Sequence, residues 1–199
     1  AASTAIYGAR GANGVVLITT KRGKAGTSRV SYDAYYGTQQ VNKTLDVLNS
    51  TQFAALENEI FKTSVFADPN NPGPNTNWQN LIFKQAPIQN HQLTVTGGTE
   101  KTQVALSLNY FDQSGIIINS RFRRYSLRAN VDHRVNNWLK VGTSLLLSNS
   151  VNNRIPTGST SIDGPAVTAS ILGAALAAPP TLVPFREDGS VWPFGDQFN

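Results

Sequence analysis

The chain has 199 residues, of which 40% are hydrophobic and 15% are charged. This composition excludes a disordered chain, and the length is sufficient for one sizeable domain with a core. The formal net charge is +5, but the 17 Lys and Arg residues are scattered along the chain, so a nucleic-acid partner is not indicated. There is no Cys, which excludes disulfides, a thiolate metal site and a cysteine nucleophile.

The first residues carry a glycine-rich motif, with glycines at positions 8, 11 and 14. Their spacing is not the G-x-G-x-x-G of a dinucleotide site, and a predicted strand follows them instead of a helix. The glycines indicate a compact turn, and the β-branched run from Val15 to Thr19 predicts a short buried strand. The motif residues to which we assign a structural role are Tyr7, Gly8, Arg10, Gly11, Asn13 and Gly14.

Alternation of apolar and polar residues predicts about five amphipathic strands in the region 30–150. The apolar positions are Val30, Tyr32, Ala34 and Tyr36, then Leu93 and Val95, then Val104, Leu106, Leu108 and Tyr110, then Tyr125, Leu127, Ala129 and Val131, and finally Leu139, Val141, Thr143, Leu145 and Leu147. The polar face of the fourth strand holds Arg124, Arg128, Asn130 and Asp132. Strands of roughly ten residues have the length that a tilted strand needs to cross a bilayer.

Short and long connections alternate between these strands. The segments 98–101 and 135–137 are predicted tight turns, whereas the other links are longer. This asymmetry is typical of outer-membrane barrels, which have short periplasmic turns and long outer loops. On this interpretation the strand at Val30 runs outward, its successors alternate in direction, and Trp138 lies at the periplasmic rim. A soluble antiparallel sheet with one face on a core also explains the alternation, so a β-sandwich binding module is the alternative.

Helices are predicted in two long loops. In the segment 41–87, Asn49 and Gln52 match a capping box. The apolar face of the helix that follows would hold Phe53, Leu56 and Ile60. In the second loop, a short apolar helix is expected to start at Gly164-Pro165 and to end at Pro179-Pro180. It is too short to span a bilayer, so any membrane crossing must be made by strands.

The sequence contains no recognisable catalytic or metal-binding constellation. His91 and His133 fall in different predicted strands without a nearby pair of carboxylates, so a metal site is not indicated. Asp112 and Asp132 form no recognisable acid/base pair, and the G-x-S-x-G, H-E-x-x-H and P-loop patterns are absent. We therefore expect neither an enzyme nor a cofactor.

The glycine-rich motif carries a family resemblance. Residues 6–14, with the sequence Ile-Tyr-Gly-Ala-Arg-Gly-Ala-Asn-Gly, resemble the end of the plug domain in TonB-dependent outer-membrane transporters, and in particular the SusC/RagA branch. The resemblance covers most of the chain up to about residue 150, and the final loop is less distinctive. The matching segments are Tyr32–Gly37, Asn77–Gln79, Pro87–His91, Thr96–Gly98, Ser107–Tyr110, Gly115–Ile117 and Arg123–Asn130.

The resemblance implies an all-β fold with short loop helices, forming part of a large antiparallel transmembrane β-barrel. The expected division is the C-terminal end of a plug domain in 1–24, the first barrel strands with a helix-containing outer loop (41–87) in 25–150, and a long extracellular loop in 151–199. The chain starts at Ala1 without an initiator Met or a leader, so we interpret it as an internal segment, although a mature chain processed at Ala1 would also lack a leader. Plugged barrels have about 22 strands, so this segment is not expected to fold alone.

The function implied by the resemblance is energy-coupled import of oligosaccharides or peptides across the bacterial outer membrane. The implied partners are a SusD-like surface lipoprotein, the TonB complex of the inner membrane and outer-membrane lipid. A sensor that signals to a sigma regulator would be a variant with an additional N-terminal signalling domain. The polar residues Arg124, Arg128, Asn130 and Asp132 are expected to face the lumen, and Arg10 is expected to contact Asp132. Substrate-binding residues are left unassigned.

Overall fold

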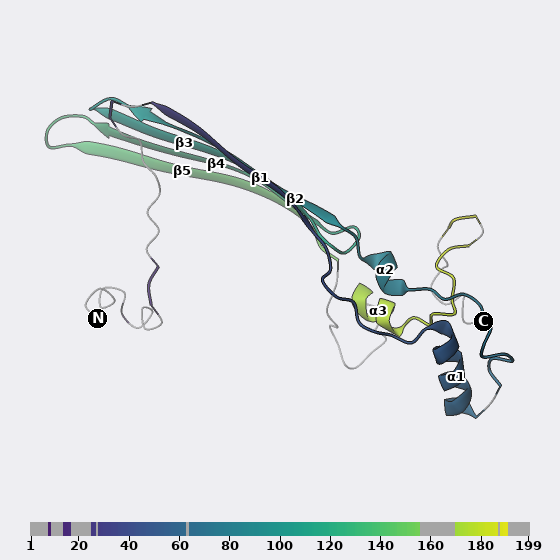
Figure 1. Cartoon of the computed structure of the whole chain (residues 1–199). Helices are drawn as coiled ribbons and strands as arrows, with labels where there is room; N and C mark the ends of the chain where they lie inside the picture. The colour runs from purple at the N-terminus through teal and green to yellow at the C-terminus, as the bar shows by residue number, and fades with distance from the viewer. Residues whose placement is uncertain are drawn as a thin grey trace. The chain divides into compact units, whose positions relative to one another are not determined.

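The computed structural model describes residues 8, 14–16, 25–26, 28–62, 64–155, 170–186 and 188–190. The strands in this part of the chain are β1 (Arg29–Gln39), β2 (Ala86–Gly98), β3 (Thr102–Ser114), β4 (Arg121–Arg134) and β5 (Lys140–Asn153). The helices are α1 (Ser50–Phe61), α2 (Trp78–Ile82) and α3 (Ile171–Ala177). Figure 1 shows the five strands side by side in one sheet with the order β1-β2-β3-β4-β5, which makes it a mostly antiparallel meander.

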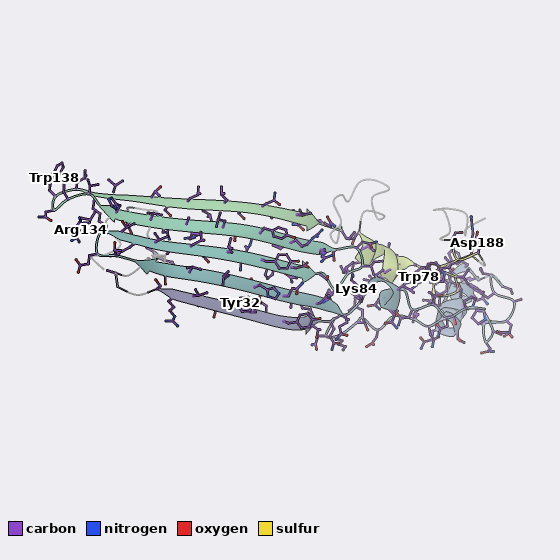
Figure 2. The ribbon with its side chains drawn as sticks, turned by 90° about the horizontal axis from the view of Figure 1, so that it is seen from above. Tyr32, Trp78, Lys84, Arg134, Trp138 and Asp188 are labelled. Atoms are coloured by element: carbon purple, nitrogen blue, oxygen red, sulfur yellow. The ribbon has the colours of Figure 1, made fainter. Side chains whose placement is uncertain are left out.

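Both predicted tight turns are present. Residues 99–101 join β2 to β3, where the backbone N–H of Thr99 donates to the carbonyl of Thr102 over 2.7 Å. Gly98 is required at this turn, because a Cβ there would collide with the backbone of Thr102. Residues 135–139 join β4 to β5, and Figure 2 shows Trp138 at this turn, where it is 82% exposed.

A polar side chain shapes the second turn from within. The Asn136 side-chain oxygen accepts hydrogen bonds from the backbone N–H groups of Trp138 and Leu139, over 3.1 and 2.7 Å. Asn is favoured in turns because its short side chain can replace a backbone acceptor in this way. The sequence Val-Asn-Asn therefore predicted the place of the turn for a physical reason.

The strands are longer than the alternation predicted. In β3 the pattern ends at Tyr110, because Phe111 comes next on the polar side and Asp112 follows on the apolar side. The strand nevertheless continues to Ser114, held by its neighbours β2 and β4. Backbone pairing can thus carry a strand past the point where its side chains stop alternating.

The capping box of α1 is confirmed. The Asn49 side chain accepts from the Gln52 backbone N–H over 2.8 Å, and the Gln52 side chain accepts from the Asn49 N–H over 3.0 Å. The helix ends at Phe61, and the C-cap residue Lys62 that follows has a left-handed φ of 51°. On its predicted apolar face Phe53 is half-buried, whereas Leu56 and Ile60 are exposed. The buried residues of the helix are Ser50 and Ala54 instead.

The other two helices differ from the prediction. The short helix α2 was not predicted; it begins where the Asn77 side chain accepts a hydrogen bond from the Asn80 backbone N–H over 3.2 Å. In the second loop, α3 starts at Ile171, because Ser170 is an extended cap residue, so the predicted start at Gly164-Pro165 is wrong for this helix. Its end before Pro179 is as Pro179-Pro180 predicted. The predicted start at Gly164-Pro165 lies outside the described residues. None of the helices that the structure describes is long and apolar enough to cross a membrane.

The described residues form two compact units. One unit contains the described parts of Ala1–Asp33 together with Gln92–Asn109 and Ser126–Ser148, and its buried apolar residue is Ala105. The other contains Ala34–His91, Tyr110–Tyr125 and the described parts of Asn149–Asn199. Its buried apolar residues are Ala54, Ile82, Ala86 and Ala175. In the described chain no large side chain is fully buried, so neither unit has an extensive core of its own.

The glycine-rich motif is described at only two of its assigned positions. Gly8 and Gly14 have φ angles of 58° and 98°, which an L side chain rarely adopts, so glycine is needed at both. Tyr7, Arg10, Gly11 and Asn13 lie outside the described residues. In the predicted strand after the motif, Val15 and Val16 belong to no strand, and its remaining residues are among those not described.

Candidate functional site: a two-faced sheet and a loop pocket

The polar residues predicted on β4 meet polar or small residues of β5. The Ser144 hydroxyl donates to the Asn130 side-chain oxygen over 2.7 Å. The Asp132 carboxylate lies against Gly142, where a Cβ would come within 2.6 Å of its Oδ1 atom. Asn130 and Asp132 are only 7% and 6% exposed. The two strands therefore present their polar positions on the same face of the sheet.

Farther along the same face of β4, an arginine lies over an aromatic pair. The guanidinium carbon of Arg124 is 5.6 Å from the centroid of the Phe111 ring, within the range of a cation–π contact. The Phe111 ring is in turn 5.9 Å from that of Phe122. Sequence reasoning missed both phenylalanines because it ended the strands before them, although alternation from Arg124 would have placed Phe122 on this face. Arg128, the fourth predicted residue, is half-buried on the same strand.

The opposite face of the sheet carries exposed apolar side chains and a row of rings. Leu106 and Leu108 on β3 are exposed, as are Val141 and Leu145 on β5. The row consists of one ring from each of three neighbouring strands, namely His91, Tyr110 and Tyr125. The His91 and Tyr110 rings are stacked at 6.0 Å between centroids, and the Tyr110 and Tyr125 rings lie 5.1 Å apart.

Beside this row lies the ion pair of Asp112 and Arg121. The Arg121 Nε and Nη2 atoms donate to the two carboxylate oxygens of Asp112 over 2.9 and 2.6 Å. The Tyr110 hydroxyl donates to Asp112 over 3.0 Å, and the Gln89 side-chain amide lies 3.5 Å away. Asp112 is only 4% exposed, so these donors replace the water that a buried carboxylate has lost.

In the unit that contains the helices, two loops far apart in sequence are fastened together. The Trp78 indole Nε1 donates to the carbonyl oxygen of Pro179 over 2.9 Å. The Thr76 backbone N–H donates to the Pro180 carbonyl over 2.8 Å, and the Thr76 hydroxyl donates to the Leu182 carbonyl over 2.6 Å. These bonds place α2 beside α3, as Figure 1 also shows.

The buried side chain of Gln79 forms hydrogen bonds within the first loop. The side-chain oxygen of Gln79 accepts from the Leu45 backbone N–H over 2.9 Å, and its nitrogen donates to the Leu45 carbonyl over 2.7 Å. In the same loop the Asn75 side chain accepts from the backbone N–H of Ser50, the first residue of α1, over 3.0 Å. The start of α1 and the residues before it are thus fixed relative to α2.

These contacts enclose a half-open pocket of about 620 Å³. Its walls come from the chain before α1, the first turn of α1, the start of α2 and the end of α3. The residues that line it are Asp46, Val47, Leu48, Gln52, Phe53, Thr76, Trp78, Gln79, Ala175, Leu176, Ala177, Ala178 and Pro180. Sequence reasoning predicted the helices α1 and α3 but not that they share a pocket, because the contacts join segments about a hundred residues apart.

The second loop also contains a tight turn near its described end. The Gly189 backbone N–H donates to the carbonyl of Arg186 over 2.9 Å, and Gly189 has a φ of 80°. The backbone N–H of Ser190 donates to the Asp188 carboxylate over 2.8 Å. Hydrogen bonds from the Ser190 side chain and backbone hold the pKa of Asp188 below its ordinary value.

The two histidines lie in strands and have ordinary partners. His91 stacks on Tyr110, and the Nδ1 atom of His133 is 2.7 Å from the Thr102 hydroxyl. Over the described residues, no group of three or more His, Cys, Asp or Glu is arranged to hold a metal ion. Neither histidine is therefore part of a described cation site.

Comparison with known proteins shows the family. No protein-family model matches the chain, but individual proteins do. TonB-dependent receptor P3 of Formosa agariphila is 33% identical over 191 residues, which are 96% of this chain and 18% of that protein. TonB-dependent receptor SusC of Bacteroides thetaiotaomicron is 32% identical over 205 residues, 96% of this chain and 19% of that protein. The chain belongs to the SusC/RagA-type TonB-dependent receptors.

Solved structures of the same type agree with the observed fold. The structure of the RagAB peptide transporter superposes on this chain with a TM-score of 0.75 at 26% identity, covering 96% of this chain and 25% of that one. The RagAB peptide importer in its open-open state gives a TM-score of 0.73 at 26% identity. The five-stranded sheet with its loop helices therefore aligns with part of a TonB-dependent receptor.

Two facts about the SusC/RagA-type receptors bear on this segment. They reside in the bacterial outer membrane, and they are transporters rather than enzymes. The segment spans less than a fifth of the length of P3 and SusC. The residues described above therefore align with only a part of such receptors, and what the protein carries is a matter for proposal.

Proposed function

We propose that this segment belongs to a TonB-dependent importer that carries oligosaccharides or peptides across the outer membrane. The observation that carries the proposal is a sheet with two unlike faces, found in a chain that aligns along nearly its full length with SusC/RagA-type receptors. In the proposed division, residues 1–24 form the C-terminal end of the plug domain. Residues 25–150 form the first strands of the barrel wall with their loops, and residues 151–199 form an outer loop.

The two faces support an orientation in the membrane. Exposed leucines and valines on one face suit contact with lipid, and the row of His91, Tyr110 and Tyr125 on that face resembles the aromatic girdle of a barrel. The other face, with Arg124, Arg128, Asn130 and Asp132, would then line the lumen. Charged groups on that side can be satisfied by water or by the plug.

Strand length supports the same orientation. β3 has 13 residues, which at ~3.3 Å per residue extend about 43 Å. A strand tilted by ~40° then rises about 33 Å, enough to cross an apolar band of ~25 Å. The β-sandwich alternative needs a second sheet against the apolar face, and the described strands form a single sheet.

The partners follow from the same proposal. A SusD-like lipoprotein would cover the outer loops and help to capture substrate. A TonB-type protein of the inner membrane would supply the energy by acting on the plug. No covalent bond of the substrate would change, in keeping with the transporter family.

The test is uptake by cells that carry the full-length receptor. We expect cells with the receptor to accumulate labelled oligosaccharides or peptides, and expect cells without it, or without TonB, to lose that uptake. Deletion of the adjacent SusD-like gene, where one is present, should lower uptake at limiting substrate. Equal uptake with and without TonB would contradict the energy-coupled mechanism, and receptor-independent uptake would contradict the function itself.

A further inference from the structure

The loop pocket has walls that are mainly alkyl and aromatic. Val47 and Leu48 precede α1, Phe53 lies in its first turn, and Leu176 and Ala177 come from the end of α3. Val47 and Leu48 are 50% and 43% exposed although they line a cavity, so they have apolar surface available for a ligand. Removing such surface from water is favourable in proportion to its area.

Most polar groups that line the pocket are already engaged. Both atoms of the Gln79 amide are bonded to the Leu45 backbone. The Trp78 indole N–H is bonded to Pro179, and the Thr76 hydroxyl donates to Leu182. These groups hold the walls in place and have few hydrogen bonds left to offer a ligand.

Two lining groups remain available. The Asp46 carboxylate makes no hydrogen bond or ion pair with the part of the chain that the structure describes, and it is exposed. The Gln52 side-chain oxygen accepts from Asn49, which leaves its N–H groups free to donate. Asp46 is also the charged residue among the described lining residues, so the rim of the pocket is acidic.

We infer that this pocket binds a peptide substrate by one or two apolar side chains, with a cationic group of the same peptide near Asp46. The inference rests on the proposed function and narrows its substrate class. A sugar bound here would place many hydroxyl groups against alkyl walls without partners, at a cost for each unpaired group. An apolar side chain loses nothing in that way, and about 620 Å³ is a usual volume for a ligand pocket.

The rigidity of the walls strengthens the inference. The hydrogen bonds from Thr76, Trp78 and Gln79 fix the two loops before any ligand arrives. A pocket formed in advance saves the conformational entropy that a mobile loop would lose on binding. These hydrogen bonds do not involve the side chains of the lining alanines. Substituting such an alanine therefore changes the volume of the pocket without removing a bond that holds its walls.

The test uses the purified full-length receptor in detergent. The probes are the peptide Ala-Leu-Lys-Leu-Ala, the peptide Ala-Ser-Lys-Ser-Ala and maltohexaose. We expect the leucine peptide to bind at least about tenfold more tightly than the other two, because it alone offers large apolar side chains. A benzophenone group on the leucine peptide should cross-link to residues 46–53 or 175–180.

Paired variants locate the site. Ala177→Phe fills the pocket and should lower the affinity for the leucine peptide about tenfold, whereas Ala174→Phe, exposed on the same helix outside the pocket, should leave it unchanged. Asp46→Asn should weaken binding of the lysine-containing peptide about threefold, and Glu59→Gln, exposed on α1, should not.

The possible outcomes distinguish failure of this inference from failure of the proposed function. An unchanged affinity in Ala177→Phe, tighter binding of maltohexaose, or cross-links only elsewhere would overturn the inference while leaving TonB-dependent uptake intact. Cross-linking of residues 46–53 and 175–180 to the SusD-like partner in place of the peptide would also overturn it and identify a docking surface. Whole-cell uptake that is the same with and without the receptor would instead contradict the proposed function.

Discussion

The Trp78 indole nitrogen lies 2.9 Å from the carbonyl oxygen of Pro179, so one hydrogen bond joins the loop before β2 to the loop that follows β5. Trp78 is half-buried, and its ring forms part of the pocket wall. This side chain thus lines the pocket, and its hydrogen bond adds to the two from Thr76 that join the same loops. Removing the indole N–H should therefore mainly loosen the second loop.

Trp78→Phe should loosen the second loop without unfolding the sheet. The ring is largely kept, while the hydrogen bond is lost and the Pro179 carbonyl needs another partner, at a cost of about 1 kcal/mol. Hydrogen exchange of the full-length receptor should show faster exchange in residues 170–186. Trp138→Phe is the matched control, because Trp138 is exposed at the β4–β5 turn. Equal exchange in both variants would mean that other contacts hold the loop.

The ion pair of Asp112 and Arg121 should contribute to the stability of the sheet. Arg121→Gln leaves a carboxylate that is 4% exposed with fewer donors, and because Arg121 itself is partly exposed we expect a loss of about 1–3 kcal/mol. The double variant Asp112→Asn/Arg121→Gln should lose less than the sum of the two single variants. The temperature at which the full-length receptor loses its folded gel mobility would measure this. Strictly additive losses would show that the pair is not coupled.

Two adjacent residues of β3 test the orientation of the sheet. Leu106 is on the apolar face, and Ser107 is on the polar face, where its hydroxyl lies 3.3 Å from that of Thr94. Leu106→Arg should therefore reduce the folded receptor in the outer membrane, with a cost of about 2–4 kcal/mol for a cation facing lipid. Ser107→Arg should be tolerated, since it would face the water-accessible lumen. The reverse result would mean that the polar face contacts lipid and that the apolar face lines the lumen.

The sequence predicted the elements best where local physics determines them. The alternation of apolar and polar residues predicted which side chains of a strand share a face of the sheet. The capping box at Asn49 marked the start of α1. The five-residue α2 is too short to show helical periodicity, and its one signal was the capping residue Asn77. The pair of Asp112 and Arg121 was missed because it depends on how the strands on either side of the 115–120 connection align. The pocket was missed because its contacts join distant loops, which no local pattern reveals.

The predicted contact between Arg10 and Asp132 remains open to a direct test. Asp132 lies on the polar face against Gly142, as the hypothesis requires, while Arg10 is outside the described residues. If the two meet, Arg10→Gln and Asp132→Asn should couple by about 1–3 kcal/mol in a double-mutant cycle on the full-length receptor, because each change alone removes the same charge–charge contact. Arg22→Gln provides the control, since it lies in the same proposed plug segment and should combine additively with Asp132→Asn. Additive effects in both cycles would mean that Arg10 and Asp132 do not interact. The Asp132 carboxylate would then interact only with residues of the barrel wall.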